Sequence, residues 1–199
     1  MTRAALRSVE APPVDGRDDG DAILRRVGDG DAAALGLAFD RYHRDVYNFL
    51  ARLRGDRNDL DDLVQLTFLA LPSAASHFDG RGTPRAFVLG VAFQVARRER
   101  RRVFRRFALW MAREADIDVP VAPLDPERSV LDRESLDRLE VAIAKLPEAQ
   151  RETFVLVEVE GLKGEEAARI LDVPVNTVWT RLHHARLSLR EKLRSRGER

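Results

Sequence analysis

Residues 165–193 read EEAARILDVPVNTVWTRLHHARLSLREKL, in which two short helical patterns flank the tripeptide Asp172-Val173-Pro174. A link of this length allows only a tight turn, so the second helix must cross the first. Helical spacing predicts that the buried face of the second helix consists of Val178, Leu182, Ala185 and Leu189. Its outer face is then expected to carry Thr177, Thr180, Arg181 and His184, with Trp179 at the side. This is the helix-turn-helix arrangement, whose second helix fits the major groove of DNA.

The ends of the two helices add further expectations. Ala167, Ala168 and Leu171 are the small packing residues of the first helix, and Asn176 or Thr177 is expected to cap the second. The Arg181 side chain is suited either to pair with both acceptors of a guanine or to hold a phosphate. Because many helical bundles also contain such a hairpin, the rest of the chain must decide between a scaffold and a DNA reader.

The composition limits the classes of protein to consider. The 199 residues suit one large domain or two small ones. No stretch approaches the roughly 18 apolar residues that cross a bilayer, and residues 1–21 lack the apolar segment of a secretory signal. We therefore expect a cytoplasmic protein without membrane insertion. The chain has no cysteine, which excludes disulfides and thiolate metal sites, and its four histidines show no zinc spacing.

Charge is strongly segregated along the chain, although the net charge is only +1. Residues 97–106 contain seven arginines and one glutamate, and residues 176–199 carry seven basic and two acidic side chains. Between these clusters, residues 114–140 carry nine acids and three arginines. Two basic clusters separated by an acidic stretch indicate two contacts with a polyanion, and solvated helix faces are the alternative interpretation.

The N-terminal half is predicted to be a helical module preceded by an extension. Residues 1–21 are rich in proline, glycine and aspartate and predict a disordered segment, and helical patterns fill residues 22–106. Asp31 is expected to cap a helix that runs to about Leu53.

Two further helices are expected in this module. Asn58 or Asp59 should cap the helix LDDLVQLTFLAL, which Pro72 should end. Its apolar stripe consists of Leu60, Leu63, Val64 and Phe68. After the loop SHFDGRGTP, the next helix starts near Arg85 and is expected to bury Phe87, Val88, Val91, Ala92 and Val95. A polar stripe beside these residues consists of Gln94, Arg98, Arg101 and Arg105.

The C-terminal half is predicted to be a second helical module behind a linker. Residues 107–130 are acidic, contain three prolines and predict a linker, and residues 131–199 form the second module. Its first helix carries Leu136, Leu139, Ile143 and Leu146 at helical spacing. Pro147 can start the next helix, and TFVLVEVE has strand propensity, although its neighbours favour a helix. The predicted fold class is therefore all-α, with two small helical modules.

Four stretches resemble one known family. Residues 146–186, LPEAQRETFVLVEVEGLKGEEAARILDVPVNTVWTRLHHAR, resemble the fourth conserved region of bacterial sigma factors, especially those of the extracytoplasmic-function type. FDRYHRDVYNFL at 39–50 and GDRNDLDDLVQLTFLAL at 55–71 resemble the family's second region, and RAFVLGVAFQVARRERRR at 85–102 resembles its promoter-opening helix. The matches occur in the family's order and cover about residues 22–193.

The resemblance implies three binding surfaces. The helix that docks on core RNA polymerase would contribute Asp59, Asp62, Leu63, Gln65 and Leu66, with Phe68 in its core. The start-proximal (minus-ten) promoter element would be bound by His77, Asp79, Arg81, Phe87, Gln94, Arg98, Arg101 and Arg102. The upstream (minus-thirty-five) element would be read by Asn176, Thr177, Trp179, Thr180, Arg181 and His184. The family also implies an anti-sigma partner and no cofactor.

This sequence departs from the family pattern at several positions. Pro72 and Phe87 stand where the family has tryptophan, Leu66 where it often has glutamate, and Trp179 where it usually has lysine. Two roles stay open for Trp179: contact with sugar and thymine methyl groups, or packing against a neighbouring protein.

Two other classes of protein compete with this interpretation. A stand-alone helix-turn-helix regulator would share the C-terminal module, but the Asp-Leu-Val-Gln stretch at 62–65 argues against it. An enzyme is disfavoured because Asp59, Asp61 and Asp62 have no second acidic motif with which to hold magnesium. The chain also lacks a phosphate-binding glycine loop and a G-x-S-x-G motif.

Overall fold

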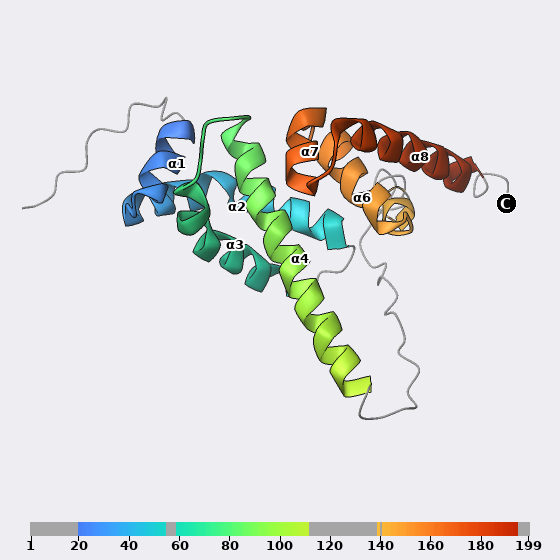
Figure 1. The fold of residues 1–199 in the computed structure, drawn as a ribbon, viewed down its shortest axis with the longest axis horizontal. Helices are drawn as coiled ribbons and strands as arrows, with labels where there is room; N and C mark the ends of the chain where they lie inside the picture. The colour runs from blue at the N-terminus through green and yellow to red at the C-terminus, as the bar shows by residue number, and fades with distance from the viewer. Residues whose placement is uncertain (1–19, 55–58, 112–138, 140, 195–199) are drawn as a thin grey trace, which may run out of the picture.

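A computed structural model of the chain describes residues 20–54, 59–111, 139 and 141–194, and its regular elements in these ranges are all helical (Figure 1). The first four helices are α1 (Gly20–Gly28), α2 (Ala32–Arg54), α3 (Leu60–Ala75) and α4 (Pro84–Met111). They are followed by α6 (Glu148–Phe154), the π-helical turn η1 (Val155–Val159), α7 (Gly164–Leu171) and α8 (Val175–Arg194). The all-α prediction is confirmed. The predictions for residues 1–19 and 112–138 lie outside the described ranges.

Helices α1 to α4 pack together as the first module, and α2 begins as the sequence predicts. The Asp31 carboxylate accepts hydrogen bonds from the N–H groups of Ala33 and Ala34, at 2.9 and 3.1 Å, and so caps the helix. The Ala34 N–H and the Arg26 guanidinium hold the pKa of Asp31 below its usual value. The module therefore has a defined turn between α1 and α2.

The ends of helix α3 differ from the prediction. Asp59 occupies the cap position in a left-handed conformation (φ 61°), and its side chain makes no capping hydrogen bond. Pro72 lies inside the helix, which continues to Ala75. Proline removes one N–H donor but keeps a helical φ, and burial of Leu71 and Ala75 on either side favours a continuous helix. The predicted stripe of Leu60, Leu63, Val64 and Phe68 is buried, as expected.

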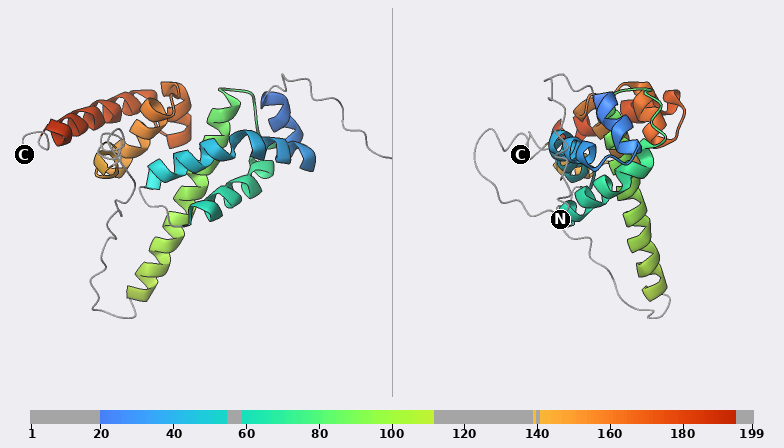
Figure 2. Two further views of the ribbon diagram at one scale, coloured as in Figure 1. Left: turned by 180° about the vertical axis from the view of Figure 1, so that it is seen from behind. Right: turned by 90° about the vertical axis from the view of Figure 1, so that its left-hand side faces the viewer.

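Helix α4 begins at Pro84, where the Thr83 hydroxyl accepts a hydrogen bond from the Ala86 N–H at 3.1 Å. It continues to Met111 and so includes residues 107–111, which the sequence analysis assigned to the linker. The C-terminal half of α4 projects beyond the other helices in all three views (Figures 1 and 2). Val88, Ala92 and Val95 are buried, whereas Phe87 and Val91 are half-buried.

The second module contains α6, η1, α7 and α8. The ambiguous TFVLVEVE segment is helical and includes the π-helical turn η1, in which the Glu160 N–H donates to the Val155 carbonyl at 2.9 Å. Helix α7 ends with Asp172 in the left-handed conformation, and the Val173 N–H donates to the Ala168 carbonyl at 3.1 Å. These features form a Schellman motif, with aspartate where glycine is usual.

The cap of α8 differs from the prediction. The helix begins at Val175, so Asn176 and Thr177 lie in its first turn and neither is the cap. The Pro174 carbonyl instead accepts hydrogen bonds from the N–H groups of Thr177 and Val178, at 2.9 and 3.4 Å. The predicted buried face of Val178, Leu182, Ala185 and Leu189 is confirmed. Among the described residues, we find no helix with the length and apolar character required to span a bilayer.

Replacing Leu50 with alanine should lower the free energy of unfolding by about 2–5 kcal/mol, because the fully buried Leu50 side chain would leave a cavity. Leu69→Ala is the matched control, since Leu69 is 74% exposed and its loss should change stability by no more than about 0.5 kcal/mol. Urea titrations followed by circular dichroism measure both values. Similar losses for the two variants would contradict the burial of Leu50 in the first module.

Candidate protein and nucleic-acid interfaces

One face of α3 is exposed and carries both polar and apolar side chains. Asp62, Gln65 and Leu66 are exposed along it, and Leu69 follows at the same helical spacing. Asp59, at the start of the helix, is also exposed. Leu63 is buried, so its side chain belongs to the core and not to this face. Sequence reasoning missed Leu69, although its spacing from Leu66 and Gln65 would have placed it on this face.

The predicted DNA-binding residues in the loop before α4 and in its first turn differ in exposure. His77, Asp79 and Arg81 are exposed, and the Arg81 guanidinium pairs with the Asp79 carboxylate at 3.3 Å. Phe87 is half-buried, because its ring packs edge-to-face on that of Phe78 with 4.9 Å between centroids. Gly80 and Gly82, with φ of 72° and 90°, turn the backbone on either side of Arg81.

The predicted polar stripe lies on α4 as expected. Its exposed members are Gln94, Arg98, Arg101 and Arg105. Arg102 is also exposed and pairs with Glu99 at 3.4 Å. Sequence reasoning missed Val103 and Phe104, which are 62% and 70% exposed among these arginines. The projecting half of α4 is therefore a basic helix with an exposed aromatic ring.

The N-terminal half of α4 meets α7 of the second module. The Gln94 side-chain amide donates a hydrogen bond to the Ile170 carbonyl at 3.2 Å. One turn earlier, a Cβ atom at Gly90 would lie 3.3 Å from Cγ1 of Ile170, so the two helices approach closely there. Farther along α4, Arg100 pairs with Glu148 at the start of α6.

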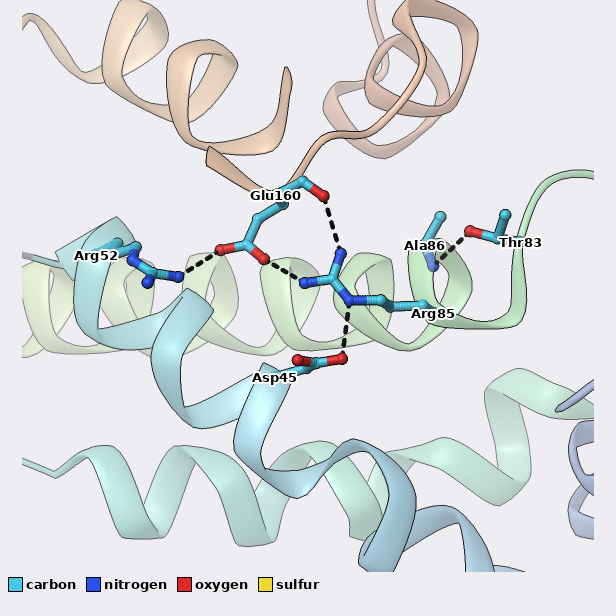
Figure 3. A network of polar contacts seen from close by, with 6 residues as sticks. All are labelled: Asp45, Arg52, Thr83, Arg85, Ala86 and Glu160. Carbon is cyan, nitrogen blue, oxygen red and sulfur yellow. Dashed lines mark hydrogen bonds and ion pairs between the residues drawn. The ribbon is translucent and has the colours of Figure 1, made fainter. Parts of the chain in front are cut away.

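A buried carboxylate forms the centre of this junction (Figure 3). The Glu160 side chain is 2% exposed and accepts hydrogen bonds from Arg85 at 2.5 Å and from Arg52 at 3.1 Å. Arg85 also donates to the Glu160 carbonyl at 2.9 Å and to the Asp45 carboxylate at 2.8 Å. Burial lowers the pKa of Arg85, but the Asp45 and Glu160 carboxylates outweigh it and leave the pKa raised.

A second acid connects α7 to the loop before α4. The Glu166 carboxylate accepts hydrogen bonds from the Thr83 N–H at 2.8 Å and from the Lys163 N–H at 3.0 Å. Burial raises the pKa of Glu166, but these donors hold it below its usual value. Beside it, the Arg169 guanidinium donates to the Arg81 carbonyl at 2.7 Å. Sequence reasoning identified neither Glu160 nor Glu166, since no local pattern marks a contact across two modules.

The predicted recognition residues of α8 occupy two kinds of position. Asn176, Trp179, Thr180 and His184 are exposed. Thr177 and Arg181 are half-buried on the flank of the helix, and not fully outward as expected. Arg181 lies near Glu152 of α6, whose pKa is raised by burial and lowered in part by Arg97, Arg100, Arg151 and Arg181.

The Trp179 ring packs within its own module. A Cβ atom added at Gly164, the first residue of α7, would overlap this ring, and Gly164 is buried. Trp179 remains 48% exposed. The ring therefore rests on the N-terminus of α7, an intramolecular contact that neither of the two open roles anticipated.

Comparison with known proteins gives the same two modules. Residues 38–106 match the family described as Sigma-70 region 2, and residues 136–189 match Sigma-70, region 4. The chain is 31% identical over 179 residues to the ECF RNA polymerase sigma-E factor of Haemophilus influenzae, covering 86% of this chain and 94% of that one. The chain belongs to the extracytoplasmic-function family of RNA polymerase sigma factors. It is thus a regulatory protein that directs RNA polymerase to promoters.

Other relatives and solved structures agree with this membership. SigE of Mycolicibacterium smegmatis is 31% identical over 179 residues, which cover 87% of this sigma factor and 67% of SigE. The structure of CnrH in complex with the cytosolic domain of CnrY has a TM-score of 0.62 at 26% identity, covering 89% of this chain and 99% of CnrH. The sigma factor RpoE of Bartonella quintana, solved with the anti-sigma factor NepR, shares the fold with a TM-score of 0.63 at 21% identity and coverage of 80% and 96%.

The Trp179–Gly164 contact predicts strong coupling between two substitutions. Gly164→Ala should destabilise the protein, because its methyl group would displace the Trp179 ring. In a Trp179→Ala background the same change should be neutral or mildly stabilising, since Gly164 has no positive φ and alanine favours a helix. A double-mutant cycle from thermal or urea unfolding should give a coupling of roughly 0.5–3 kcal/mol. Additive effects would show that the two residues do not touch.

Proposed function

We propose that this sigma factor binds core RNA polymerase through the exposed face of α3. That face consists of Asp59, Asp62, Gln65, Leu66 and Leu69. Exposed leucines among polar groups are unfavourable in water and favour burial against a partner protein. On the opposite face of α3, the buried Leu63 and Phe68 pack the helix against the rest of the first module.

Helix α4 and the loop before it engage the minus-ten element. The exposed Arg98, Arg101 and Arg102 supply a basic track for a separated strand, and the exposed Phe104 ring adds a surface on which a base can stack. His77, Asp79 and Arg81 of the preceding loop and Phe87 and Gln94 of α4 complete this surface. Polar groups and an aromatic ring are the side chains that hold a flipped base.

Helix α8 reads the minus-thirty-five element in the major groove. Asn176, Thr180 and His184 present polar groups outward from its N-terminal half, which is the part of a recognition helix that reaches base edges. Arg181, on the flank near Glu152, contributes a guanine or phosphate contact from the side of the groove. The Trp179 ring packs on Gly164 and is partly exposed on the same helix.

The protein acts by binding and does not catalyse a reaction. It acts in the cytoplasm. CnrH and the Bartonella quintana RpoE were each solved with a partner, named as the cytosolic domain of CnrY and the anti-sigma factor NepR. This supports an anti-sigma partner for the present chain as well. The observation that carries the function is the order of the region 2 and region 4 matches on two modules, each with an exposed basic helix.

Run-off transcription tests this function. Core RNA polymerase is incubated with a library of genomic fragments from the host, with and without the purified sigma factor. We expect discrete new start sites, preceded by two shared sequence elements. Tight binding to a palindromic duplex without polymerase, together with no new start sites, would instead favour a stand-alone regulator.

Arg181→Ala should weaken binding to the cognate minus-thirty-five element by roughly 1–3 kcal/mol if Arg181 contacts a guanine. The holoenzyme is titrated with the cognate promoter and with a promoter whose minus-thirty-five element is scrambled. The matched control is Arg190→Ala, because Arg190 is an exposed arginine farther along α8. This change should weaken binding to both promoters equally. If Arg181→Ala weakened binding to both promoters equally, Arg181 would contact a phosphate and not a base.

A further inference from the structure

Helix α1 lies beside the loop that joins α3 to α4 (Figures 1 and 2). This loop, residues 76–83, belongs to the surface proposed to bind the minus-ten element. The buried residues of α1 are Gly20, Ile23, Leu24 and Val27, which fix the helix to the first module along one face. Arg25 is exposed on the other face of α1. The surroundings of Arg25 connect α1 to the minus-ten surface.

The two ends of α1 touch the two ends of this loop. A Cβ atom added at Gly20 would lie 2.9 Å from the Pro84 ring and 2.5 Å from the Tyr42 hydroxyl, and Pro84 is the first residue of α4. A Cβ atom added at Gly28 would lie 2.6 Å from the carbonyl oxygen of Ala75, the last residue of α3. Both positions therefore require glycine, because a side chain would keep α1 away from its neighbours.

These contacts make α1 a brace for the loop. Gly20 and Gly28 are eight residues apart in the helix, and a rise of about 1.5 Å per residue separates them by about 12 Å. One end of α1 rests on the start of α4 and the other on the end of α3. The rigid helix therefore fixes the distance between the two points at which the loop leaves the module.

The middle of the loop also meets α1, at Arg25. A Cβ atom added at Gly80 would lie 3.7 Å from Nη2 of Arg25 and 3.9 Å from Oδ2 of Asp21. Gly80 turns the backbone with a φ of 72°, and the next residue is the exposed Arg81. Two exposed arginines, one from α1 and one from the loop, thus lie next to Gly80.

We infer that Arg25 is a further residue of the minus-ten surface and binds a phosphate of the separated strand where that strand passes the loop. The inference rests on the proposed function, because it needs the loop and α4 to hold the minus-ten element. It extends that surface from the loop and α4 onto α1. The brace formed by α1 then holds Arg25 at a fixed place beside Gly80.

The chemistry of Arg25 suits this role better than that of its neighbour Arg26. The Arg25 side chain is 62% exposed, and its guanidinium lies 3.6 Å from the Asp21 carboxylate, which is longer than a hydrogen bond. An exposed pair of this kind contributes little to stability, so the guanidinium can donate to a phosphate instead. Arg26, in contrast, is hydrogen-bonded at 3.0 Å to Asp31, which caps α2.

Binding of a single strand to the reconstituted holoenzyme tests this inference. The probe is a fluorescent single-stranded oligonucleotide that carries the minus-ten element found by run-off transcription. Arg25→Ala should weaken binding about 3- to 10-fold and lower the slope of log Kd against log salt concentration by about 0.7, because one phosphate contact is lost. Arg25→Lys should retain most of the affinity, since an ammonium group also binds phosphate.

Arg44→Ala is the matched control. Arg44 is exposed on α2, two residues after Tyr42, and therefore lies about 200° farther around that helix than the side chain that meets Gly20. This change should leave both the affinity and the salt slope as in the wild type. Arg25→Ala should unfold at the same temperature as the wild type, because the Arg25 side chain is exposed.

The outcomes separate this inference from the function on which it rests. If Arg101→Ala weakens binding and Arg25→Ala does not, the proposed minus-ten surface stands and the inference fails. A loss for Arg25→Ala that changes when one base of the probe is replaced also overturns it, since a phosphate contact does not depend on sequence. If the wild-type holoenzyme does not bind the probe, the proposed function fails, and the inference fails with it.

Discussion

The burial of the Glu160 carboxylate is the constraint on which the arrangement of the two modules depends. A buried charge is unfavourable unless opposite charge and hydrogen bonds compensate it. Arg85 and Arg52 supply this compensation from α4 and α2, so the end of η1 must lie against both helices. The π-helical turn widens the backbone just before Glu160, and α7 follows four residues later. This side chain, together with the contacts of Glu166, Gln94 and Arg169, places the helix-turn-helix beside α4.

This position divides α4 into two parts with different environments. Its N-terminal half lies between the first module's core and α7, where Gly90 permits the close approach of Ile170. Its C-terminal half projects beyond the other helices, with Arg98, Arg101, Arg102 and Arg105 exposed (Figure 2). One helix therefore contains a segment that contacts α7 and a segment whose basic side chains are exposed.

Features that depend on residues close together in the sequence were predicted better than features that depend on residues far apart. The buried faces of α3 and α8 depend on spacing within one helix, and the apolar pattern predicted them correctly. Pro72 and the cap of α8 were predicted wrongly, because burial of Leu71 and Ala75 and the Pro174 carbonyl outweighed local preference. Glu160 and Arg52 are 108 residues apart, and no pattern within a single sequence links such positions. The exposure of most residues on these surfaces was therefore predictable, and the contacts between the two modules were not.

The contacts between the two modules are largely polar. An apolar interface would leave a large hydrophobic patch on each module after separation, with a risk of aggregation. Here Glu160, Glu166, Arg169 and Gln94 make the principal polar contacts, and each of these groups can exchange its protein partner for water. Ile170 is the apolar side chain that meets Gly90, so part of the junction still gains from burial. The junction between α4 and α7 therefore combines hydrogen-bonded polar groups with one close apolar contact.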